Sequence, residues 1–140
     1  MTIADYCEEF FAKKIYVNKE YQRSDERWSA PARSFLIESI LLGYPLPKFY
    51  LYPITDTARR RSLKEIVDGQ QRTAAIVDFF SGELSLSKNF EIEALRSKTY
   101  KDLPEDRKRD FLSYPLSIDL FSDILEVEIY EVLTPPLQAS

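Results

Sequence analysis

The chain has 140 residues, of which 44% are hydrophobic and 30% are charged, the composition of one soluble globular domain with its own core. No apolar run approaches the ~20 residues that cross a bilayer, and residues 1–14 lack a signal-peptide pattern, so we expect a cytoplasmic protein. The absence of histidine and the single cysteine, Cys7, exclude an internal disulfide and a metal site of the Cys or His type. We expect Cys7 to be a small buried apolar residue.

The net charge of −4 is unlike that of proteins that bind nucleic acid through their whole surface, so any such contact must be local. Two short basic runs are candidates, Arg59-Arg60-Arg61 between two expected strands and Arg107-Lys108-Arg109 beside acidic residues of an expected helix. A solvated surface is the commoner role for either run. The arginine triplet at 59–61 is the better nucleic-acid candidate, because no acidic residue interrupts it.

The first residues predict a helix, a short strand and a polar loop. A capping box that opens at Thr2 predicts a helix ending near Lys13, and alternation over residues 15–17 predicts an extended segment. Residues 20–29 are polar and predict a loop. Within it, Trp28 is either a packing residue of the core or hinge, which we prefer, or part of a ligand rim.

The clearest helix follows this loop. Ser29 is a suitable N-cap, Pro31 fits the first turn, and Gly43 followed by Pro45 ends the helix. One apolar stripe at helical spacing is expected to face the core. Its members are Ile37, Ile40, Leu41 and Tyr44.

Two antiparallel strands are expected next. Residues 49–52 are rich in aromatic side chains and residues 63–67 are apolar, as strands require. Pro53 marks the end of the first strand or an edge position. Residues 55–61 are expected to form the connecting loop.

The remaining elements complete an α+β domain. A helix is expected over residues 70–80, a helical turn over 91–97, and a helix of about ten residues after Asp102, with Pro104 in its first turn. Alternating apolar residues predict two further strands, joined as a hairpin through Ser122 and Asp123. They cover residues 116–120 and 125–129, so that the domain spans 1–133 and a tail spans 134–140.

The most informative residues are Asp68-Gly69-Gln70-Gln71-Arg72, which join an apolar strand to an amphipathic helix. Gly69 allows a sharp turn, and the free N–H groups and dipole of a helix start favour an anion. Arg72 adds a forked donor that suits a phosphate. A core-facing stripe on the helix would leave these first-turn polar groups free to face a ligand. The stripe comprises Thr73, Ile76, Val77 and Phe80.

Two interpretations of this motif remain open. It is either a phosphate-binding turn or a structural turn in which Asp68 caps the helix and Arg72 pairs with a surface acid. In the first, Asp68 could hold Mg²⁺ or orient a water, although capping is its commonest role. Gln70 and Gln71 could position a water or read a ribose or base edge. The candidate catalytic residues are Asp68, Gln71 and Arg72.

The motif follows other short elements in a specific order, namely Tyr21-Gln22-Arg23, Trp28 and Gly43-Tyr44-Pro45-Leu46-Pro47. This order resembles the N-terminal domain of GmrSD-type, modification-dependent restriction proteins, the DGQQR-motif family, over about residues 6–132. The resemblance implies a ParB/sulfiredoxin-like fold, a small mixed sheet with flanking helices. It also implies that Asp68, Gly69, Gln70, Gln71 and Arg72 bind and hydrolyse a nucleoside triphosphate (ATP, GTP or UTP) with Mg²⁺. Arg23 would be a second charged group nearby.

In full-length members of this family, the activity is coupled to cutting foreign or modified DNA in prokaryotic phage defence. The nuclease domain usually contains histidine, and this chain has none, so we expect cleavage to need a C-terminal domain or a partner chain. Three functions compete: an NTP-binding and hydrolysing domain, which we favour, a nucleotide-gated switch without turnover, and a module whose pentapeptide binds a DNA phosphate.

Overall fold

The computed structural model describes residues 1–18 and 27–121. Arg23, the strand expected at 125–129, its hairpin through residues 122–123 and the tail at 134–140 lie outside the described residues. No helix in the described ranges is long and apolar enough to span a membrane.

The described residues form an α+β fold with a small mixed sheet, as expected. Its strands are β1 (Ile15–Val17), β2 (Phe49–Asp56), β3 (Arg61–Asp68) and β4 (Ile118–Leu120), in the order β1-β3-β2-β4. β2 and β3 are antiparallel, whereas β1 pairs with β3, and β4 with β2, in parallel. The two long strands therefore occupy the centre of the sheet.

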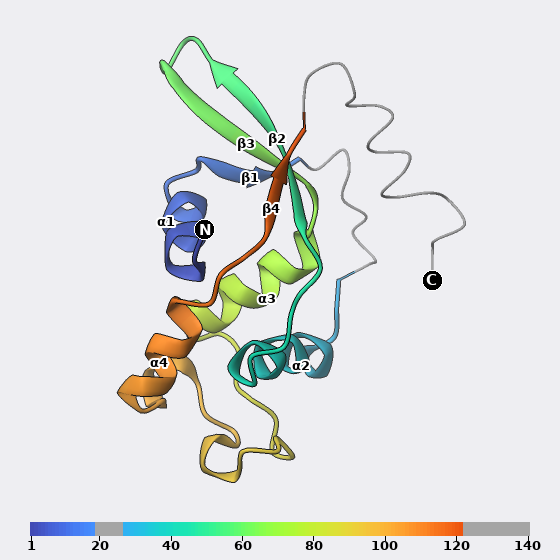
Figure 1. The fold of residues 1–140 in the computed structure, drawn as a ribbon, viewed down its shortest axis with the longest axis vertical. Coiled ribbons are helices and arrows are strands. Elements are labelled where there is room, and N and C mark those ends of the chain that lie inside the picture. The colour runs from blue at the N-terminus through green and yellow to red at the C-terminus, as the bar shows by residue number, and fades with distance from the viewer. Residues whose placement is uncertain (19–26, 122–140) are drawn as a thin grey trace, which may run out of the picture.

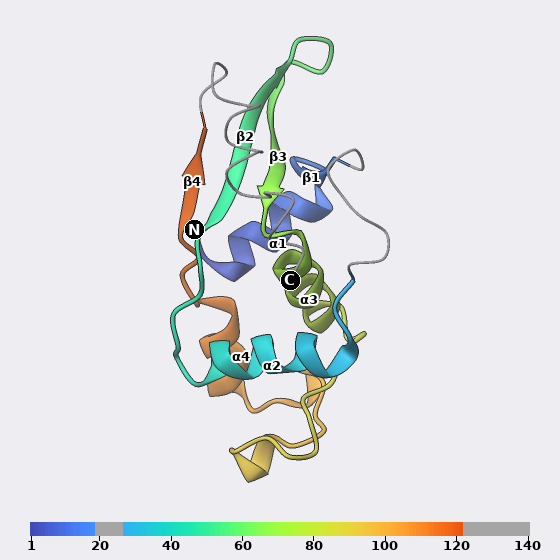
Figure 2. The same ribbon diagram turned by 90° about the vertical axis from the view of Figure 1, so that its right-hand side faces the viewer.

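Four α-helices accompany this sheet in the described part of the chain: α1 (Ile3–Phe11), α2 (Ala30–Leu41), α3 (Gln70–Phe80) and α4 (Glu105–Leu112). Helix α3 starts directly where β3 ends and packs against α1 and α2. Helices α2 and α4 lie at the end of the molecule opposite the β2–β3 hairpin (Figures 1 and 2). Short 3₁₀ turns at Glu93–Leu95 and Tyr100–Asp102 lie between α3 and α4 in sequence.

The predicted helix boundaries are confirmed where a local cap specifies them. The Thr2 side chain accepts a hydrogen bond from the Asp5 N–H at 3.2 Å, and the Ser29 side chain accepts one from the Ala32 N–H at 3.3 Å. Helix α3 has the predicted bounds, and Gly43 adopts a φ of +80° just after α2. These signals act within one turn, which is why the sequence reveals them.

Other predictions of local structure are wrong in detail. Tyr44 does not extend the stripe of α2, because the helix ends at Leu41 and the Tyr44 side chain is 52% exposed. Helix α4 has eight residues, and Pro104 is its N-cap without a side-chain cap. The Asp102 carboxylate instead accepts a hydrogen bond from the Thr99 hydroxyl at 3.2 Å.

The β2–β3 hairpin is longer than predicted. Both strands run well into the predicted loop, so the turn covers only residues 57–60. Pro53 lies inside β2, where it pairs with Lys64 of β3. Within residues 1–18 and 27–121, no strand pairs with Pro53 on the other side of β2, in agreement with the predicted edge position.

The core face of α3 is rotated relative to the predicted stripe. Thr73 and Ile76 are buried as expected, but Val77 and Phe80 are only partly buried. Ala75 and Phe79 are fully buried in their place, and the Phe79 ring packs on Phe111 with centroids 5.1 Å apart. The same rotation buries Arg72, whose relative solvent exposure is only 8%.

Cys7 is fully buried, as predicted, and supplies a test of the packing of α1. Burial raises the pKa of the Cys7 thiol from 9.0 to about 12. Because the thiolate is the reactive form, we expect iodoacetamide at pH 8 to label Cys7 in urea but not in the folded protein. The unfolded thiol ionises first as the pH rises, so the free energy of unfolding should fall between pH 9 and about 12. Equal labelling rates with and without urea would contradict this packing.

Candidate functional site

The turn between β3 and α3 depends on a glycine for two separate reasons. Gly69 is the N-cap of α3 and has a φ of +118°, a conformation that side chains disfavour. A Cβ atom built at this position would lie 2.6 Å from the Phe49 Cδ2 atom. The turn thus brings the backbone of the motif directly against an aromatic ring of β2.

Asp68 does not cap the helix, so that prediction is wrong. No side chain of the described residues caps α3, and the Asp68 carboxylate instead accepts a 3.4 Å hydrogen bond from Arg72 Nη2. The Asp68 side chain remains 36% exposed. The Gln70 amide donates back to the carbonyls of Ile66 and Val67, at 3.3 and 3.2 Å. The Gln70 side chain therefore lies along the end of β3.

Arg72 makes internal contacts instead of facing solvent. Its Nη1 donates to the carbonyl oxygens of Pro47 and Lys48, at 2.5 and 3.2 Å. The guanidinium carbon lies 4.6 Å from the centre of the Phe49 ring. Burial lowers the pKa of Arg72, and the charge of Asp68 opposes that shift. The expectation that the first-turn polar groups are all free to face a ligand is therefore wrong for Arg72.

The backbone at the start of α3 retains donors for an anion. The Gly69 carbonyl accepts the first helical bond, from the Thr73 N–H at 2.8 Å. Among the described residues, none accepts a hydrogen bond from the N–H groups of Gln70, Gln71 or Arg72. The positive end of the helix dipole adds to the same site.

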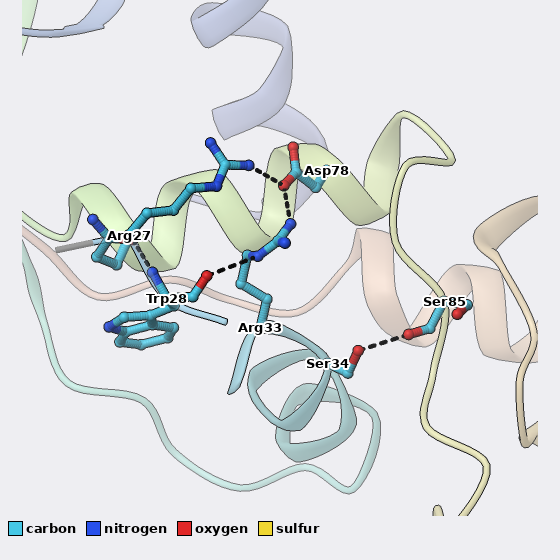
Figure 3. A network of polar contacts seen from close by, with 7 residues as sticks. Arg27, Trp28, Arg33, Ser34, Asp78 and Ser85 are labelled. Atoms are coloured by element: carbon cyan, nitrogen blue, oxygen red, sulfur yellow. Dashed lines mark hydrogen bonds and ion pairs between the residues drawn. The ribbon is translucent and has the colours of Figure 1, made fainter. Parts of the chain in front are cut away.

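Gln71 fixes the position of Trp28. Its Oε1 accepts a hydrogen bond from the Trp28 N–H at 2.9 Å, and Arg33 Nε donates to the Trp28 carbonyl at 3.4 Å. Arg33 and Arg27 both pair with the Asp78 carboxylate on α3, at 2.5 and 3.3 Å. Figure 3 shows Arg27 and Arg33 converging on Asp78 beside Trp28. This set of contacts, the Trp28 clamp, joins the motif helix to the start of α2.

An aromatic groove borders the motif. It encloses about 520 Å³, and Trp28, Phe35, Tyr44, Pro47 and Arg72 lie along its walls. Phe35 is 69% exposed and Tyr44 is 52% exposed, whereas Trp28 is partly buried against the core. Trp28 therefore packs against the core, as preferred from the sequence, and also lines the groove, while its part in a ligand rim stays a prediction.

Phe35 and Tyr44 are residues of the groove that the sequence does not identify as site residues. Phe35 is apolar at a position outside the buried stripe of α2, which is the signal that could have revealed it. Tyr44 was assigned to that stripe, although the adjacent Gly43 and Pro45 already placed it in the connection.

The structure brings only some of the predicted site residues together. Arg72 and Trp28 both line the groove, and Gln71 contacts Trp28, whereas the length of β3 separates Arg61 from Asp68. Arg23 lies outside the described residues. Within the described ranges, no group of three Asp, Glu, His or Cys side chains is arranged to hold a metal ion. Asp68 supplies the only carboxylate of the motif, and carboxylates are the protein ligands that Mg²⁺ most often uses beside phosphates.

The Gly69–Phe49 contact predicts a large effect for a small substitution. We expect Gly69→Ala to lower the free energy of unfolding by about 3 kcal/mol, because backbone strain and overpacking against Phe49 add. Gly82→Ala is the matched control, since Gly82 has a φ of +83° and open space around it. It should cost only about 1 kcal/mol in the same urea titration. Equal losses would mean that the Phe49 contact is unimportant.

The Trp28 clamp can be measured directly, because Trp28 is the sole tryptophan. We expect Gln71→Met to shift its fluorescence to longer wavelength, to increase quenching by acrylamide and to destabilise the fold by about 1 kcal/mol. Gln70→Met is the control, since the Gln70 amide contacts Ile66 and Val67 instead. An unchanged Trp28 spectrum in Gln71→Met would contradict the clamp.

Comparison with known proteins gives one family. The model of the GmrSD restriction endonuclease N-terminal domain matches residues 7–134 of this chain. No curated protein and no solved structure matches. The matched range includes the whole motif, the Trp28 clamp and the groove. Because the match covers most of the sequence, the chain belongs to the GmrSD restriction endonuclease N-terminal domain family.

Proposed function

We propose that this domain binds a nucleoside triphosphate beside the first turn of α3 and hydrolyses it, as the nucleotide-responsive part of a DNA restriction protein. One observation carries the proposal: a helix start whose first N–H groups have no acceptor in the described part of the chain lies beside an aromatic groove. The two features suit the two ends of a nucleotide, since the first favours phosphate and the second favours a base.

The phosphates would lie at the start of α3. The N–H groups of Gln70, Gln71 and Arg72 point from a helix end where the dipole is positive. The half-exposed Asp68 carboxylate would repel phosphate by itself, but a Mg²⁺ ion reverses that interaction. Magnesium is commonly held by one or two carboxylates together with substrate phosphates, so Asp68 fits this role.

The base would lie in the groove. Its volume of about 520 Å³ is within the range of small-molecule sites. Trp28, Phe35 and Tyr44 supply aromatic surface, which any base can stack on. This arrangement explains binding of a nucleoside triphosphate without selecting among ATP, GTP and UTP.

Arg72 has a different role from the one first expected. Its Nη1 is committed to the carbonyls of Pro47 and Lys48, so it holds the groove wall against the helix. We therefore assign Arg72 to positioning the site and leave phosphate binding to the backbone amides. Hydrolysis would add water to the terminal phosphorus and release the nucleoside diphosphate, with Asp68 and the Gln71 Nε2 group orienting that water.

A nucleotide-gated switch without turnover is the second candidate. It is favoured by the fact that Asp68 is the only carboxylate of the motif and is already paired with Arg72. Arg23 is proposed as a further charge at the site. In either case, DNA cleavage would be carried out by a C-terminal nuclease domain or a partner chain.

Binding is tested by titrating the 140-residue chain with ATP, GTP and UTP in the presence of Mg²⁺. We expect at least one of them to quench Trp28 fluorescence and to raise the melting temperature. At a hundredfold excess over Kd, the free energy of unfolding should rise by about 2.7 kcal/mol. Inorganic tripolyphosphate should raise the melting temperature without quenching Trp28, because it lacks a base. Asp68→Asn should weaken the Mg²⁺-dependent part of binding.

The control for that variant is Asp110→Asn, which removes an exposed carboxylate from α4 and should bind nucleotide normally. Release of phosphate by the wild-type chain separates hydrolysis from the switch. Absence of any response to millimolar triphosphate would refute both, and tripolyphosphate binding alone would remove the groove from the proposal.

A further inference from the structure

The β2–β3 hairpin extends beyond the rest of the sheet. Among the described residues, β1 pairs with β3 at Lys64–Ile66 and β4 pairs with β2 at Phe49–Leu51, with no pairing beyond these positions. Past them, the described hairpin is a two-stranded ribbon that projects away from the helices (Figure 1).

The tip of this ribbon is positively charged. Arg59 and Arg60 are exposed on the turn, and Arg61 follows at the start of β3. Asp56 is the only acidic residue between positions 55 and 62. Its carboxylate accepts hydrogen bonds from the N–H groups of Ala58 and Arg59, both at 3.1 Å. Asp56 therefore stabilises the turn and neutralises one of the three arginine charges.

The arginines of the tip are poorly matched within the described residues. The Arg59 Nε atom lies 3.8 Å from Asp56, yet the Arg59 side chain is 69% exposed. The Arg61 Nε atom is buried without a hydrogen-bond partner in the described part of the chain. The exposed guanidinium groups of Arg59 and Arg60 are the donors that suit the oxygens of phosphate groups.

The second basic run of the chain does not share this property. On α4, Arg107 pairs with Asp110 and Lys108 pairs with Glu105, each at 3.6 Å. The acidic partners lie on the same helix and reduce the local field. Two runs of similar sequence therefore differ in the charge that they present to a partner.

We propose that the tip of the β2–β3 hairpin contacts the sugar–phosphate backbone of duplex DNA. The major groove admits a two-stranded β-ribbon, and the exposed Arg59 and Arg60 would meet phosphates on its walls. The contact is independent of the nucleotide proposal, because it uses the end of β3 farthest from Asp68.

The experiment measures binding of the full chain to a fluorescent 24-base-pair duplex, by anisotropy at 50 to 200 mM salt. The variant is Arg59→Ala with Arg60→Ala, and its control is Arg107→Ala with Arg109→Ala, which removes the same charge. Arg61 is kept because its Nε atom is buried. Arg60 has a φ of 56°, and alanine and arginine are similarly strained in this conformation. The substitution should therefore leave folding unaffected.

We expect the hairpin variant to weaken duplex binding and to make the slope of log K against log salt shallower by about 2, since each phosphate contact contributes about 0.9. The control variant should retain the wild-type slope. Equal losses in both variants, no duplex binding by the wild-type chain at 50 mM salt, or tighter binding to a 24-nucleotide single strand would each overturn the proposal. Nucleotide quenching of Trp28 should be unchanged in the hairpin variant, which keeps the two proposals separable.

Discussion

The stacking of the Arg72 guanidinium on the Phe49 ring organises the centre of this domain. Arg72 belongs to α3 and Phe49 to β2, and the guanidinium also binds the two carbonyls that precede Phe49. Tyr6 of α1 contacts the same ring at 5.5 Å and shares a 2.8 Å hydrogen bond with Thr73. A buried charge needs such partners, because removing one leaves an uncompensated group that costs several kcal/mol.

This arrangement changes how the five-residue motif is understood. Gly69 makes room for Phe49, Gln70 lies back along β3, Gln71 holds Trp28, and Arg72 holds residues 47 and 48. Each of these four residues thus makes a contact within the fold that does not depend on a ligand. An arginine locked in internal contacts argues against direct phosphate binding by Arg72. The case for a nucleotide therefore depends on the uncommitted amides and the adjacent groove.

The sequence predicted what short-range chemistry specifies. Thr2, Ser29 and Gly43 act within a turn of the helices they delimit, and the motif helix follows from its glycine and apolar spacing. Burial of Arg72 was not predictable in the same way, because its acceptors lie 24 and 25 residues earlier in the chain. The groove was missed for a similar reason, since Phe35, Tyr44 and Arg72 meet only after α2 has packed on α3.

The energies of these contacts indicate which part of the site can move. Arg72 is buried and held by several partners, so releasing it would disturb the contact between α3 and β2. The Trp28 clamp is more exposed, since the Arg27 side chain that contributes to it is 63% exposed. The Trp28–Gln71 hydrogen bond and the exposed Arg27–Asp78 ion pair are worth about 1 kcal/mol each or less. A base that stacks on Trp28 could therefore shift this clamp while Arg72 stays in place. Because Asp78 ties the clamp to α3, a change at Trp28 would act on the motif helix and on the start of α2 together.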